Sequence, residues 1–163
     1  MSALTRLMLS VCLLMPFSLS ACSQQKAADP DAQFASVIGA RLEPQLELRT
    51  QKKQFAPSDP IGLLVLNRTG KTIFFEDQSF SVRAYKYDTR AEKWVPVSLG
   101  FYILFPEQLA VPPIQETTVP PSYVMNTNLP PGKIRLVIVG WTEQSKPANT
   151  RIAAYTEIEI LRQ

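Results

Sequence analysis

The residues with the clearest chemistry form one short motif, Leu19-Ser20-Ala21-Cys22, close to the start of the chain. An apolar run over residues 7–19 leads into it, and Arg6 is the only charge before that run. A basic start, an apolar segment of about 13 residues and small residues at a cut site are typical of a secretory signal peptide. A membrane-spanning helix needs about 20 apolar residues, so this run is too short to serve as one. We therefore expect a signal peptide over residues 1–21.

This motif resembles the lipobox of bacterial lipoproteins, in which a leucine and two small residues precede a cysteine. The resemblance implies that the thiol of Cys22 is joined to a diacylglycerol and that a peptidase cuts before this residue. It also implies that the new amine is acylated, and two or more buried chains anchor a protein firmly. The expected location is the cell envelope, on the outer membrane or on the outer leaflet of the cytoplasmic membrane. Ser23 does not invoke the known rule by which an Asp after the lipidated cysteine retains a lipoprotein in the inner membrane.

Few side chains remain for catalysis. The sequence has no histidine, and its second cysteine, Cys12, lies inside the signal peptide. With Cys22 carrying lipid, the exported chain has no thiol nucleophile and no disulfide, and it lacks the commonest general base and metal ligand. We therefore expect no catalytic residue, no cofactor and no metal site. After residue 21 the chain has 16 basic and 14 acidic residues, which is too balanced to indicate nucleic-acid binding.

Several weaker signals have ordinary structural interpretations. Glu157 and Glu159 lie on one face of a predicted strand, where a solvated surface is a simpler interpretation than a catalytic carboxylate pair. Glu76, Asp77 and Asp88 flank predicted turns and lack the spacing of a calcium-binding loop.

Two further signals concern sugars. Asn67-Arg68-Thr69 matches a glycosylation sequon, but its place in a predicted turn explains it better. The aromatic residues Tyr85, Tyr87, Trp94 and Trp141 are the candidates for a sugar-stacking platform. Core packing is the favoured interpretation for them, because large aromatic side chains of β-sandwiches are mostly buried.

The elements that must position these residues begin with a tether, assigned to residues 22–44, which is polar at its start. Phe34, Val37, Ile38 and Leu42 recur at helical spacing within it, with Asp31 placed to cap, so a short packed helix is an alternative for this stretch.

From Gln45 onward, apolar alternation and turn residues predict about seven strands over residues 45–163 and no long helix. Two sets of alternating residues stand out: Ile134, Leu136 and Ile138; and Ile152, Ala154, Thr156, Ile158 and Ile160. The pattern predicts an all-β chain that folds as an antiparallel β-sandwich.

The stretch Leu129-Pro130-Pro131-Gly132-Lys133-Ile134 resembles the turn that enters the penultimate strand of fibronectin type III and related immunoglobulin-like domains. Leu129, Pro131 and Gly132 match that pattern, whereas Ile134 stands where the family has a tyrosine. The resemblance implies an immunoglobulin-like topology. Residues 101–121 fit it least well, because their prolines cannot donate to a β-ladder; we expect one short strand, a crossing segment and a core position for Phe105.

Taken together, these patterns favour a non-catalytic, lipid-anchored envelope protein that acts as a protein-interaction or accessory module. The alternative is a lipoprotein that binds a ligand or glycan. An exposed apolar patch or a free strand edge would favour the first hypothesis, and a concave pocket with aromatic walls would favour the second.

Overall fold

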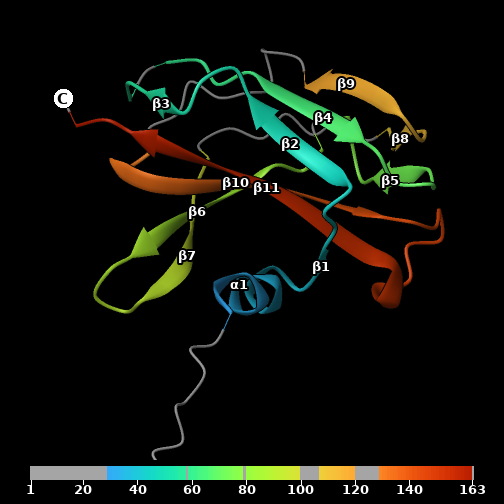
Figure 1. The fold of residues 1–163 in the computed structure, drawn as a ribbon, viewed down its shortest axis with the longest axis horizontal. Helices are drawn as coiled ribbons and strands as arrows, with labels where there is room; N and C mark the ends of the chain where they lie inside the picture. Colours follow the sequence, from blue (N-terminus) through green and yellow to red (C-terminus); the bar gives the residue numbers. More distant parts are fainter. Residues whose placement is uncertain (1–28, 58, 79, 100–106, 120–128, 163) are drawn as a thin grey trace, which may run out of the picture.

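The computed structural model describes residues 29–57, 59–78, 80–99, 107–119 and 129–162 (Figure 1). Its elements, in chain order, are α1 (Pro30–Ile38), β1 (Arg41–Leu42), β2 (Leu46–Thr50), β3 (Gln54–Phe55), β4 (Leu63–Asn67), β5 (Ile73–Phe75), β6 (Arg83–Asp88), β7 (Lys93–Val97), β8 (Leu109–Val111), β9 (Gln115–Val119), β10 (Gly132–Trp141), a 3-10 turn η2 (Ala148–Thr150) and β11 (Arg151–Ile160). The signal motif with Cys22, and Phe105, lie outside the described residues.

The strands form two sheets. Sheet A has eight strands in the order β1-β11-β10-β5-β8, with β3 also pairing with β11 and with β6 and β7 extending from β10. Sheet B has three strands in the order β2-β4-β9. Figure 1 shows sheet B and helix α1 on opposite sides of sheet A. The predicted all-β class and mainly antiparallel pairing are confirmed, and two facing sheets are compatible with a β-sandwich.

The predicted count of about seven strands is too low, since the described residues form eleven. The additional strands are short. Strands β1 and β3 have two residues each and pair in parallel with β11, which makes sheet A mixed. A two-residue strand carries no apolar alternation, so the sequence pattern had no signal for it.

The long hairpin of β10 and β11 organises the core. The two strands pair antiparallel over ten residues each, from Gly132 opposite Ile160 to Trp141 opposite Arg151. Both predicted alternating sets point into the space between the sheets and are buried, which confirms their assignment to one face. Leu46, Leu48, Leu63 and Val65 of sheet B pack against them from the other side. The principal core therefore lies between the two sheets.

Gly140 allows β5 to lie close to β10, because Trp141 pairs with Phe74 at this point. A Cβ atom at position 140 would lie 2.7 Å from Cγ2 of Ile73 and 2.9 Å from the carbonyl oxygen of Phe74. Real Cβ contacts do not reach such short distances, so only glycine fits here without a shift of β5.

The opposite face of sheet A is covered by helix α1. Asp29 caps the helix by accepting a 3.0 Å hydrogen bond from the amide of Asp31, and Gly39 ends it in the left-handed conformation. The short helix that the spacing allowed is therefore present, but Asp29 and not Asp31 is its N-cap. Phe34 and Ile38 are buried, and they form a second apolar cluster with Ala40, Tyr85, Val137, Val139 and Ala153.

The chain crosses between the sheets immediately after this helix. Strand β1 pairs with β11 at Ile152, β2 leaves to form an edge of sheet B, and β3 returns to β11 at Glu159. Because the same short stretch belongs to both sheets, it joins them along one side of the core.

Residues 107–119 contain two strands. Strand β8 pairs with β5 in sheet A and β9 pairs with β4 in sheet B, where the sequence analysis expected one short strand and a crossing segment over 101–121. No helix in the described part of the chain is both long and apolar enough to cross a membrane.

Candidate functional site

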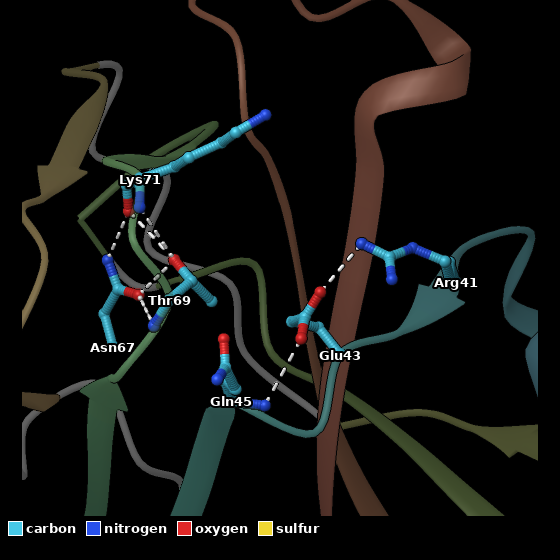
Figure 2. Close-up of polar contacts among 6 residues, drawn as sticks. All are labelled: Arg41, Glu43, Gln45, Asn67, Thr69 and Lys71. Atoms are coloured by element: carbon cyan, nitrogen blue, oxygen red, sulfur yellow. Dashed lines mark hydrogen bonds and ion pairs between the residues drawn. The ribbon is translucent and has the colours of Figure 1, made fainter.

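A polar cleft of about 380 Å³ opens at one end of the two sheets. Its walls come from β1, the turn before β2, the turn after β4 and the connection between β10 and β11. The lining residues are Arg41, Glu43, Gln45, Thr69, Gly70, Lys71, Thr142, Glu143, Asn149, Thr150 and Ile152. Figure 2 shows six residues in and behind these walls.

Asn67, which is fully buried at the end of β4, holds one wall of this cleft in place. Its amide nitrogen donates to the carbonyl oxygens of Lys71, Val111 and Pro112, at 2.9, 2.8 and 3.0 Å. Its Oδ1 accepts hydrogen bonds from the amide and the hydroxyl of Thr69, at 3.0 and 2.7 Å. The sequon Asn67-Arg68-Thr69 is thus part of a turn whose asparagine is enclosed, in line with the structural interpretation.

The charges at the cleft are mixed. Nη2 of Arg41 pairs with Oε2 of Glu43 at 2.7 Å, and Oε1 of Glu43 accepts a 3.3 Å hydrogen bond from the amide of Gln45. Figure 2 shows the Lys71 side chain extending away from Asn67 and Thr69. These groups can hydrogen-bond a polar molecule. Within the described residues, no three His, Cys, Asp or Glu side chains lie close enough together to hold a metal ion.

The structure distributes the four candidate aromatic residues over two places. Trp94 of β7 packs against Phe34 of α1 and Tyr87, with ring centroids 5.6 and 5.3 Å apart, and Tyr85 lies 5.4 Å from Phe34. Trp141 is the last residue of β10 and lies away from this group. There Lys146 and Arg151 lie 5.3 and 5.8 Å from its ring centroid. Tyr85 and Trp141 are buried, so these four rings do not make an open stacking platform.

Arg135 is the residue whose setting the sequence analysis missed. Its guanidinium carbon lies 4.5, 4.4 and 4.1 Å from the ring centroids of Phe34, Trp94 and Tyr155. Its side chain is only 7% exposed, although strand alternation placed it on the face away from the sandwich core. Burial follows from α1, which covers that face, and the available signal was the pair of apolar neighbours Val137 and Val139 on the same side.

Two carboxylates complete the surroundings of Arg135. Nε and Nη2 each lie 2.9 Å from Oε1 of Glu157, and Nη2 lies 3.2 Å from Oδ1 of Asp31. Tyr155 donates a 2.8 Å hydrogen bond to the same Asp31 oxygen. Nη1 is buried with no hydrogen-bond partner among the described residues, because aromatic rings surround the group. We name Arg135, Asp31, Glu157 and Tyr155 the arginine cluster.

The two carboxylates expected on a solvated surface differ in exposure: Glu157 keeps 33% of its side chain exposed and is otherwise enclosed by its ion-pair partners. Burial acts to raise the pKa of Glu157, but hydrogen bonds from Lys133 and Arg135 outweigh this effect and hold the pKa below its usual value. Glu159 is exposed and accepts a 2.9 Å hydrogen bond from Gln54. The two carboxylates therefore have different partners, and the arrangement stabilises the fold.

The acidic residues considered for calcium also have local structural contacts. Asp77 is buried and accepts hydrogen bonds from the amide and hydroxyl of Ser81, at 3.2 and 2.7 Å. Asp88 accepts from the amides of Arg90 and Ala91 in the turn between β6 and β7. Glu76 is exposed.

The outer face of sheet B has a second, apolar hollow of about 350 Å³. It is lined by Arg49, Thr50, Gln51, Gly62, Leu63, Leu64 and Thr118. In the strand register Leu64 lies between Arg49 and Thr118, and Leu66 lies between Glu47 and Glu116. Neither leucine belongs to a buried cluster. We name this surface, with Leu64 and Leu66 at its centre, the sheet B face.

Comparisons with known proteins gave no match, either to a protein-family model or to a curated protein sequence.

Proposed function

We propose that this chain is a non-catalytic lipid-anchored protein of the cell envelope, whose β-sandwich serves as a protein-interaction or accessory module. The anchor is Cys22, on the strength of the lipobox-like motif. The absence of histidine from the sequence supports a role based on shape and surface contacts. The proposed topology is immunoglobulin-like, supported by the Pro131-Gly132 pair, at which β10, the next-to-last strand, begins.

The observation that carries the interaction role is the sheet B face. Its centre is formed by two half-buried leucines, and Glu47 at its border pairs with Arg49 and with Arg68, the latter at 2.9 Å. An apolar centre with a charged border is the usual composition of a protein–protein contact. On the opposite side of the molecule, α1 already covers the outer face of sheet A. The proposed partner is therefore an envelope protein that presents an apolar patch to the sheet B face.

Photo-crosslinking in living cells tests the interaction role. A photoreactive residue at Thr118, on the sheet B face, is expected to give discrete crosslinks to an envelope protein. The same residue at Thr89, exposed in the β6–β7 turn, is the matched control and is expected to give none to that protein. Leu64→Lys in the Thr118 background is expected to abolish the crosslinks while leaving the melting temperature unchanged. Identical crosslink patterns from both positions would contradict the proposed role of the sheet B face.

The anchor has a separate test. Cys22→Ser is expected to give an unprocessed precursor or a soluble exported form, whereas the wild type incorporates labelled fatty acid. If the wild type takes up no label and the variant still floats with membranes, the proposed anchor is wrong.

A second candidate function rests on the polar cleft. Its volume of about 380 Å³ is within the range of small-molecule sites, and its threonine, asparagine and glutamine side chains can hydrogen-bond hydroxyl groups. A glycan-binding function predicts that soluble glycan fragments shift the NMR signals of Thr142 and Asn149. Shifts confined to the sheet B face, or none, would count against it.

A further inference from the structure

The β6–β7 hairpin carries four basic side chains, Arg83, Lys86, Arg90 and Lys93. None of these four is ion-paired to a carboxylate within the described residues, whereas six other basic side chains are. Asp88 uses its Oδ1 to accept from two backbone amides in the turn, at 2.9 and 3.2 Å. With Glu92, the hairpin carries four basic and two acidic residues, a formal charge of +2.

This charge is notable because the chain from Cys22 onward, with 16 basic and 14 acidic residues, also has a formal charge of +2. The net charge of this one hairpin thus equals the net charge of the whole exported chain. Thr89, Arg90, Ala91, Glu92 and Lys93 are all exposed. Of the four basic side chains, Arg90 and Lys93 are therefore exposed at the tip, beside Glu92, while Arg83 and Lys86 lie half-buried along β6.

The hairpin extends sheet A from β10, and it packs against helix α1. The ring of Phe34 in α1 is 5.4 Å from Tyr85 in β6 and 5.6 Å from Trp94 in β7. Figure 1 shows the β6–β7 hairpin reaching out from sheet A beside α1, on the side of the molecule away from sheet B. If the chain before α1 is anchored to a membrane, the hairpin is therefore held near that membrane as well.

The length of chain before α1 sets that distance. Helix α1 begins at Pro30, and only eight residue steps separate it from Cys22. Such a connection reaches at most about 28 Å when fully extended, and on the order of 15 Å as a flexible coil. A lipid on Cys22 would therefore keep the outer face of sheet A, with the hairpin, close to the headgroups.

We propose that the β6–β7 hairpin docks on the anionic phospholipid headgroups of the membrane that holds the lipid anchor. The inference rests on the proposed anchor at Cys22. Each Lys or Arg near an anionic surface gains a favourable Coulombic interaction that falls off within about 10 Å at moderate salt. The rings of Tyr87 and Trp94, which meet edge to face with centroids 5.3 Å apart, belong to the same hairpin, and both residue types favour membrane interfaces.

A modest charge is sufficient here, because the lipid anchor makes the docking step intramolecular. An acidic protein is a second conceivable partner for four cations. The position of the hairpin on the anchored side favours lipid, since a protein partner there would have to enter the short space beneath α1. Docking would fix the orientation of the domain, with sheet A toward the membrane and the sheet B face directed away from it.

The test uses the full lipidated protein in vesicles. With Cys22 lipidated and Cys12 removed with the signal peptide, Ala91→Cys introduces the only free thiol, to which an environment-sensitive dye is attached. Vesicles of phosphatidylcholine mixed with phosphatidylglycerol are expected to shift the dye emission to the blue and to protect it several-fold from an aqueous quencher. Phosphatidylcholine alone is expected to do neither. The matched control, Thr118→Cys on the sheet B face, should stay accessible in both.

A charge variant completes the experiment. Arg90→Gln with Lys93→Gln is expected to remove the protection at position 91 while the protein still floats with the vesicles, and high salt should have the same effect. Equal accessibility of positions 91 and 118 in anionic vesicles, with flotation intact, would overturn the docking proposal alone. Protection of position 91 that appears only when an acidic protein is added would also overturn it. Failure to float would overturn the anchor at Cys22 and this proposal with it.

Discussion

Nη2 of Arg135 in strand β10 lies 3.2 Å from a carboxylate oxygen of Asp31 in the first turn of α1. These residues are 104 positions apart, and their ion pair joins the first turn of α1 to the middle of sheet A. Phe34, one turn further along α1, lies against the same guanidinium. Arg135 thus binds the helix through an ion pair and a cation–π contact, in addition to the apolar packing of Phe34 and Ile38.

Replacement of Arg135 tests the arginine cluster. Arg135→Ala is expected to lower the free energy of unfolding by about 3 kcal/mol, since it removes three ring contacts and two ion pairs at an enclosed site. Arg135→Lys should recover only part of this loss, because an ammonium group cannot lie flat between rings while pairing with two carboxylates. Urea titration provides the measurement. Lys133→Ala, which removes an exposed ion pair to Glu157, is the control and should cost at most about 0.5 kcal/mol.

Two positions on α1, one buried and one exposed, test how much the packing of this helix contributes to stability. Phe34 is fully buried and Val37 is 49% exposed. Phe34→Ala is expected to destabilise the fold by about 3–5 kcal/mol. Val37→Ala should leave the unfolding free energy nearly unchanged. Thermal melts of both variants would decide, and equal melting temperatures would mean that α1 contributes little to stability.

The raised pKa of Tyr155 predicts that the free energy of unfolding decreases at alkaline pH. Burial, with the hydrogen bond to Asp31, raises the pKa of Tyr155 to about 12. A tyrosine in the unfolded chain ionises near pH 10, so at rising pH the unfolded state loses this proton first. The contribution of Tyr155 is therefore complete below about pH 10 and is lost as the pH approaches 12. Urea titrations across this range should show a smaller alkaline loss in Tyr155→Phe than in the wild type; equal losses would refute the assignment.

The hydrogen bonds of Asn67 predict that replacement by aspartate destabilises the fold more than replacement by alanine. Asn67→Ala is expected to cost about 2–3 kcal/mol, because three carbonyl oxygens and the groups of Thr69 lose a buried partner. Asn67→Asp should cost more, since an ionised carboxylate cannot donate to the carbonyl oxygens of Lys71, Val111 and Pro112. Chemical denaturation compares the two. Asn149→Asp at an exposed position is the control, and a smaller effect for Asn67→Asp than for Asn67→Ala would contradict the hydrogen-bond assignment.

Replacement of Gly140 tests the close approach of β5 to β10. Gly140→Ala places a methyl group within 2.9 Å of the Phe74 carbonyl oxygen, which belongs to the backbone and cannot rotate away. The expected destabilisation is about 1–3 kcal/mol, the usual range for an overpacked core. Gly70→Ala is the matched control, because a Cβ there meets nothing within 4 Å. Similar melting temperatures for the two variants would show that β5 can shift at little cost.

The sequence by itself determined the all-β class and the inward face of the long strands. The core face of β10 could be predicted from Ile134, Leu136 and Ile138, because side chains alternate strictly along a strand. The start of β10 was also recognisable, since Pro-Gly is local chemistry that precedes strands and β10 begins at Gly132. The lipid anchor at Cys22 remains a prediction from a local motif.

Only the tertiary structure decided what covers the other face of sheet A. Alternation assigns Arg135 and Glu157 to that face, but it carries no information on which distant segment packs against it. Helix α1 brings Asp31 and Phe34 there, and this turns a nominally solvent-facing arginine into an enclosed one. The parallel pairing of β1 and β3 with β11 was hidden for a related reason. Two residues are too few to show a period, and their pairing depends on contacts more than 100 positions away in the chain.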